Sequence, residues 1–413
     1  MSRSANALSP ALNQEPHHNP ARLGGTAVAF LALAAALATS TSYAIQPELT
    51  TVAGDLGSTV PVVSVVAGSA IVGYLLGLAT LVPLVDHLPP NRLVAGQLTC
   101  LAAGLVLAAA ARSPLALGAG LLVSGMCSST GAQLSTLAGK HSPPQHRGRA
   151  VGSVTAGISA GILAGRIAGG ALADRVGWRW TLLIFAVACV AVAAAAGVVL
   201  PRARVAAAEK YLDVIRSLPT RVATHRVLRV SAVSGALWFF SFSLVWVGLS
   251  LALALPPLRL SPTAIGSYSL AGLLGIVATR VAGALADRHG SPRVILGGLA
   301  LSFVCTVTMV FTLDVAPVLL VTLALFDAGL FAAQVANQSR VLSIDPRRPA
   351  KFNSTYMVVY FVGGSLGTAV GGGLVNTVGW PGVAATAAAA IAVAAVLSVR
   401  LWSAPRTPQA ANR

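Results

Sequence analysis

The chain has 413 residues, of which 55% are hydrophobic and only 9% are charged. An ordinary soluble domain carries about 25% charged residues, so we expect lipid rather than water to surround most of this chain. The net charge of +17 is compatible with nucleic-acid binding, but the positions of the basic residues favour membrane topology and no nucleic-acid partner.

Twelve apolar stretches are each long enough to cross a bilayer, which takes about 20 residues per helix. The first six are Gly25–Gln46, Ser64–Val85, Leu93–Ala111, Leu115–Ala138, Ala150–Leu172 and Trp180–Leu200. The second six are Val230–Leu255, Thr263–Leu285, Arg293–Leu313, Ala316–Arg340, Asn353–Val375 and Gly382–Trp402. We therefore predict an all-α integral membrane protein with twelve transmembrane helices in two pseudo-symmetric six-helix bundles, residues 25–200 and 230–402. Residues 201–229 form the linker between them, and residues 1–24 and 403–413 form the tails.

The lysines and arginines predict the orientation of these spans. With the N-terminus in the cytoplasm, only Arg112, Arg175, Arg179 and Arg259 lie outside the cell, and Arg166 and Arg280 lie within spans. All other basic residues, including those of the linker, then face the cytoplasm and its anionic lipid headgroups. We expect a multi-pass protein of the bacterial plasma membrane, with both termini cytoplasmic.

Two short polar segments occupy the same place in each half. "VPLVDHLPPNR", Val82–Arg92, follows the second span, and "GALADRHGSPR", Gly283–Arg293, follows the eighth span. Asp86 aligns with Asp287 and Arg92 with Arg293, which indicates an internal duplication.

These segments make the chain similar to the major facilitator superfamily, whose cytoplasmic signature is roughly G-x-x-x-D-R-x-G-x-x-R. The second copy matches it at Gly283, Asp287, Arg288, Gly290 and Arg293, whereas the first retains Asp86 and Arg92. The resemblance implies a gate whose contacts form in one conformation and break in the other. We expect Gly283 to allow two helices to approach closely. The simpler interpretation is that these residues only set the topology.

The fifth span carries a glycine pattern that resembles the drug–proton antiporter branch of this superfamily. The branch pattern is G-x8-G-x3-G-P-x2-G-G, and here Gly152, Gly161, Gly165, Gly169 and Gly170 occupy its glycine positions, with Arg166 in place of the proline. Close helix packing alone also favours such glycines.

Two charged residues inside predicted spans are candidates for proton coupling. Asp327 is the one acid near the middle of a span, and Arg166 is a guanidinium at membrane depth. Such groups are costly in lipid and are expected to face other helices or a wet cavity. We expect Asp327 to load and release the proton; the alternative is a structural partner for Arg166.

The resemblance places the first, fourth, seventh and tenth helices around a central cavity. Polar and aromatic residues of these helices and of the eleventh are candidates to line it: Tyr43, Gln46, Gln133, Trp238, Phe242, Gln334, Asn337 and Tyr356. Dense aromatic residues suit flat apolar or cationic guests, although helix packing explains many of them equally well.

The chain has no P-loop, no nucleophile–histidine–acid set and no metal-ligand spacing, so we expect no enzyme, no cofactor and no metal. We predict a monomeric, proton-driven exporter of small lipophilic or aromatic compounds. The alternatives are an uptake carrier for a sugar, nucleoside or organic anion, and a transport-inactive membrane sensor.

Overall fold

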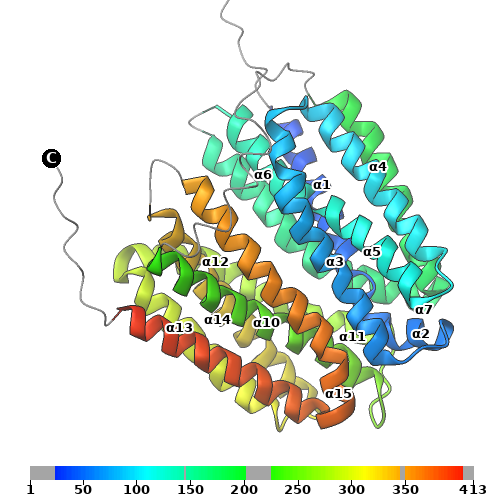
Figure 1. Cartoon of the computed structure of the whole chain (residues 1–413), viewed down its shortest axis with the longest axis vertical. Helices are drawn as coiled ribbons and strands as arrows, with labels where there is room; N and C mark the ends of the chain where they lie inside the picture. Colours follow the sequence, from blue (N-terminus) through cyan, green and yellow to red (C-terminus); the bar gives the residue numbers. More distant parts are fainter. Residues whose placement is uncertain (1–23, 144–145, 201–224, 345–348, 403–413) are drawn as a thin grey trace, which may run out of the picture.

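The structure, a computed structural model, describes residues 24–143, 146–200, 225–344 and 349–402, and every regular element in these ranges is a helix (Figure 1). The predicted C-terminal tail and nearly all of the predicted N-terminal tail and linker lie outside the described residues. We use N-terminal half for the described residues 24–200 and C-terminal half for 225–402.

The N-terminal half begins with a helix that is followed by two short helical elements and ends with a helix that is bent. Its elements are α1 (Gly25–Tyr43), η1 (Gln46–Glu48), α2 (Leu49–Asp55), α3 (Val60–Thr80), η2 (Val82–Asp86), α4 (Pro90–Ala109), α5 (Pro114–Ser128), α6 (Thr130–His141) and α7 (Arg147–Val199). Prolines begin α4 and α5, where their missing N–H costs no hydrogen bond. The Ser113 side chain also caps α5 by accepting from the Ala116 N–H.

The C-terminal half repeats this plan. Its elements are α10 (Arg226–Ala254), α11 (Pro262–Ser267), η3 (Tyr268–Gly272), α12 (Leu273–His289), α13 (Ser291–Met309), α14 (Ala316–Leu342) and α15 (Pro349–Trp402). In both halves short helices precede or follow a membrane-length helix, so several predicted spans consist of more than one helical element.

Two helices are far longer than one crossing requires. α7 has 53 residues and α15 has 54, and each is interrupted by a glycine with positive φ, Gly177 at 80° and Gly379 at 65°. Only glycine adopts that conformation without strain. Ten helices within the described residues are long and apolar enough to cross a membrane. The prediction of twelve crossings requires α7 and α15 to cross twice each and to reverse at Gly177 and Gly379.

The helix ends differ from the predicted spans because hydropathy marks the apolar part of a helix and not its termini. The first span was expected to end at Gln46, but the chain continues as η1 and α2 to Asp55. The fourth span divides at Ser129 into α5 and α6. The second signature segment is mostly helical: α12 continues to His289, and only Gly290, with φ 84°, separates it from α13.

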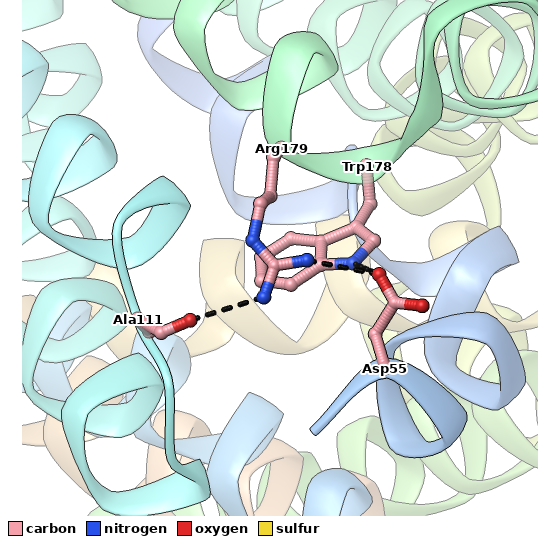
Figure 2. Close-up of polar contacts among 4 residues, drawn as sticks. All are labelled: Asp55, Ala111, Trp178 and Arg179. Carbon is pink, nitrogen blue, oxygen red and sulfur yellow. Dashed lines mark hydrogen bonds and ion pairs between the residues drawn. The ribbon is translucent and has the colours of Figure 1, made fainter. Parts of the chain in front are cut away.

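A cluster of polar contacts identifies one end of the molecule, which we call the far end (Figure 2). The Asp55 carboxylate accepts hydrogen bonds from the Trp178 indole and the Arg179 guanidinium, both at 2.9 Å. Arg179 also donates to the Ala111 carbonyl at 3.2 Å. These contacts tie together the end of α2, the loop that follows α4 and the bend at Gly177. The opposite end, where α7 ends and α10 begins, is the linker end.

The two halves meet closely at the far end. The Thr263 backbone N–H, at the start of α11, donates to the Asp174 carboxylate of α7 at 2.8 Å. A Cβ added to Gly170 would lie 2.1 Å from the Pro262 carbonyl oxygen, and one added to Gly372 of α15 would lie 2.2 Å from the Ser64 hydroxyl of α3. Two pairs of helices, α7 with α11 and α3 with α15, therefore close the far end.

Candidate functional site

Arg166 is buried at the boundary between the halves, with 3% of its surface exposed. Its Nε donates to Gln46 Oε1 at 2.8 Å. Its guanidinium carbon lies 4.1 Å from the ring centre of Trp246 and 5.0 Å from that of Tyr43, with Phe242 at 5.6 Å. Aromatic faces attract a cation most strongly where water is excluded, so rings and one amide hold this charge.

Asp327 is also buried, with 1% exposed, and lies on α14 of the C-terminal half. The Trp246 indole N–H donates to Asp327 Oδ1 at 3.2 Å. Within the described residues no salt bridge of 4.0 Å or less joins Arg166 to Asp327. Trp246 therefore connects the acid to the cation: its face contacts Arg166 and its N–H contacts Asp327.

The glycines of α7 place Arg166 at this boundary. A Cβ on Gly157, Gly161, Gly165 or Gly169 would lie within 2.4 Å of a backbone oxygen of α1. The Ser40 hydroxyl donates to the Gly161 carbonyl across the same contact at 3.0 Å. Because helices approach this closely only where side chains are absent, Arg166 enters the α1 side of the site beside Tyr43 and Gln46. Gly170 instead faces α11, and Gly152 has no atom within 4 Å of an added Cβ.

A second polar group lies within the C-terminal half. Gln334 Oε1 accepts from the Trp238 indole N–H at 3.1 Å and from the Tyr356 hydroxyl. The Asn337 amide donates to the Ser231 carbonyl at 2.9 Å and to the Tyr356 hydroxyl at 3.4 Å. Phe242 packs between the two groups, with its ring centre 6.4 Å from Trp238 and 6.3 Å from Trp246.

Seven of the eight predicted cavity residues thus fall into two neighbouring groups. Gln133 is separate: its amide donates to the Leu81 carbonyl at the end of α3, within the N-terminal half. In the described residues no cluster of three or more metal-ligating side chains occurs.

Within the described residues, no hydrogen bond or salt bridge joins a signature residue of one half to the other half. Asp287, Arg288, Arg293 and Arg92 are exposed, and Arg293 donates to the His289 carbonyl at 3.4 Å. The side chain of Asp86 lies outside the description. The expected close approach at Gly283 is wrong here, because no neighbouring helix packs there and an added Cβ would meet nothing within 4 Å.

One buried acid escaped the sequence analysis. Glu48, in η1, has only 1% of its surface exposed. It follows the predicted end of the first span by two residues and therefore looked like a loop residue. The sequence does carry a sign of its burial: the segment around it, "AIQPELTTVAGDLG", has fewer polar residues than a solvent-exposed loop would have.

Comparison with known proteins agrees with this architecture. The family description "Major Facilitator Superfamily" matches residues 29–368 and 231–413. The chain is 28% identical to the "Uncharacterized transporter YgaY" of Escherichia coli O157:H7 over 96% of this chain and 100% of that protein. It is 30% identical to the "Probable transporter SCO4007" of Streptomyces coelicolor over 92% and 89%. A "Multidrug resistance protein B homolog" of Mycobacterium tuberculosis is 25% identical over 78% and 70%.

Solved structures share the fold at lower identity. A bacterial homologue of the human lysosomal transporter Spinster superposes with a TM-score of 0.72 at 14% identity, over 90% of this chain and 95% of that one. A mutant of the nucleoside transporter NupG gives 0.68 at 15% identity, over 90% and 100%. Since the family match covers most of the sequence, the chain belongs to the major facilitator superfamily.

Proposed function

We propose that this membrane transporter exports small lipophilic or aromatic compounds in exchange for protons. Membership of the family makes it a secondary transporter with a small-molecule substrate; the direction, the ion and the class of compound are our proposal. We further propose a monomer in the bacterial plasma membrane with both termini in the cytoplasm, on the basis of the lysine and arginine distribution.

The arrangement of Arg166, Trp246 and Asp327 carries the proposal. The acid and the cation belong to different halves, and one indole contacts both. A proton that binds Asp327 removes its charge and weakens the bond from Trp246 within the C-terminal half, and Trp246 in turn contacts Arg166 of the N-terminal half. A ligand shifts the equilibrium between two conformations only through contacts that differ between them, and Trp246 is the residue through which protonation of Asp327 would act on the contact between the halves.

The surrounding aromatic rings support the class of compound. Trp238 packs against both Phe242 and Tyr360, and Phe242 lies next to Arg166. Such rings suit flat apolar or cationic guests. The similarity to a multidrug resistance protein homologue of Mycobacterium tuberculosis supports the same class.

Drug susceptibility tests the proposal. Overexpression is expected to raise the tolerance of a host cell to flat, lipophilic cations, and a protonophore is expected to abolish the gain. Asp327→Asn is expected to abolish proton-driven export while retaining substrate exchange, because the amide keeps the size but cannot bind the proton. Asp314→Asn is the matched control, since Asp314 is an exposed acid just before α14. Full proton-driven export by a well-expressed Asp327→Asn protein would remove Asp327 from the mechanism.

An uptake carrier for an organic anion or nucleoside is the second candidate, favoured by the lack, within the part of the chain that the structure describes, of any carboxylate in a salt bridge with Arg166. Right-side-out vesicles distinguish the two functions, because export and uptake respond oppositely to the direction of the proton gradient. Proteoliposomes with no flux of any compound would favour a transport-inactive sensor.

A further inference from the structure

Glu48 lies where the two halves touch at the far end. Its element, η1, packs against α7 of its own half and against α10 and α11 of the C-terminal half. It is only two residues from Gln46, which binds Arg166. With 1% of its surface exposed, its carboxyl group is enclosed by the closed interface.

No cation compensates this carboxyl group. Within the described residues, no side chain forms a hydrogen bond or ion pair with it. The guanidinium of Arg166 is directed to Gln46 and the rings, and Asp55 of α2 is bound to Arg179. The arginines of α10 lie at its start, toward the linker end, and α11 has no charged residue.

The charged group that acts on Glu48 from a neighbouring element is Asp174 of α7, which carries a like charge. Asp174 itself accepts from the first turn of α11. An ionised Glu48 in this interface would therefore be desolvated and repelled at the same time, and both effects favour the neutral form.

We propose that Glu48 is protonated while the far end is closed and releases that proton when the far end opens. Opening separates α7 from α11 and admits water to the carboxyl group, which can then ionise. Glu48 would thus be a positioning residue that links far-end opening to pH, separate from Asp327. Its use in the transport cycle rests on the proposed proton-driven export, whereas the gating step can be measured without any substrate.

A buried serine provides the measurement. Ser64 of α3 is fully enclosed against Gly372 of α15 at the far end, so Ser64→Cys reacts with a maleimide only when the far end opens. The exposed native Cys100 is replaced by alanine, and Cys127, Cys189 and Cys305 are buried. The protein is labelled in lipid nanodiscs between about pH 5 and about pH 9, with the exposed Asn376→Cys as the reference. Dividing the labelling rate of Ser64→Cys by that of Asn376→Cys removes the effect of thiol ionisation, which changes with pH in both variants.

The ratio is expected to rise with pH, by about tenfold for each pH unit over which one proton is released. Glu48→Gln is expected to abolish this dependence, and Glu48→Asp to retain it, because only the second variant keeps a titrating carboxyl group. A flat ratio in the parent protein, or a pH dependence that survives Glu48→Gln, would overturn the proposal. So would a ratio that follows Na⁺ or K⁺ concentration at constant pH. Each variant is also labelled in the Asp327→Asn background, where Asp327 cannot titrate; the rise of the ratio with pH is expected to persist there with Glu48 and to vanish with Glu48→Gln, so that this test and the test of proton-driven export can fail separately.

Discussion

At the scale of single residues, Trp246 determines how the cation and the acid of the site interact. A direct ion pair between Arg166 and Asp327 would hold the carboxylate ionised, and proton binding would then have to break it. The indole instead takes the cation on its face and donates one hydrogen bond to the acid. A cation–π contact is worth about 2 kcal/mol when desolvated, so the ring helps to hold the buried Arg166 without an ion pair to Asp327.

Replacing the indole separates its two roles. Trp246→Phe keeps an aromatic face for Arg166 but removes the N–H donor to Asp327. A hydrogen bond to a charged group contributes about 1.5–3 kcal/mol, so we expect proton-driven export to fall by about tenfold or more, while substrate exchange persists. Export rates under an imposed pH gradient measure this. Trp180→Phe is the control, because Trp180 is 63% exposed and faces away from the core. Equal loss of export and exchange would show that Trp246 only supports the fold.

The sequence predicted the charged residues of the site but not their partners. A charge within an apolar span must face the interior, and both Arg166 and Asp327 do. Gln46 and Trp246 contact Arg166 from positions far away in the chain, and no local pattern specifies such pairs. Glu48 was missed because hydropathy ended the first span before it, while the packing of η1 against α10 and α11 buries it.

At the scale of helices, the contact between α1 and α7 depends on backbone lying against backbone. Gly157, Gly161, Gly165 and Gly169 recur every four residues and therefore share one face of α7. This spacing indicates one glycine face, and the structure shows that α1 is the helix that covers it. Gly152 belongs to the antiporter pattern but lies outside the contact. The sequence could not predict this, because only the neighbouring helices distinguish Gly152 from the other glycines.

Gly165→Ala tests the contact. The added Cβ would lie 2.4 Å from the Ser40 carbonyl oxygen, so α7 must move away from α1. We expect a loss of about 1–3 kcal/mol, the usual cost of overpacking, seen as a lower melting temperature of the purified protein. Gly152→Ala has free space around the new methyl group and gains about 0.5–1 kcal/mol of helix propensity. If both variants melt at the temperature of the parent protein, the close contact does not contribute to stability.

At the scale of the whole molecule, the two ends differ in how the halves are joined. Asp174 and Thr263 form a hydrogen bond between the halves at the far end, where glycines also allow α7 and α11 to touch. At the linker end the signature residues Asp287, Arg288 and Arg293 are exposed. The halves are thus joined at the far end, whereas the signature residues at the linker end are exposed. This difference fits a transporter whose halves rock around a central site, since one end must open when the other closes.

The hydrogen bond from Thr263 to Asp174 should therefore bias the molecule towards closure of the far end. Asp174→Ala removes the acceptor; because Asp174 is exposed to solvent, the bond is worth about 0.5–1 kcal/mol, and the open population should rise by about two- to fivefold. The labelling rate of Ser64→Cys reports that population. It is measured at about pH 5, so that ionisation of Glu48 does not itself open the far end. Asp174→Asn keeps one acceptor oxygen and should label almost as slowly as the parent protein. Arg175→Ala is the control, because this neighbour is exposed and has no role in the contact. Labelling of Asp174→Ala at the parent rate would mean that packing of the glycines alone, without the hydrogen bond, keeps the far end closed.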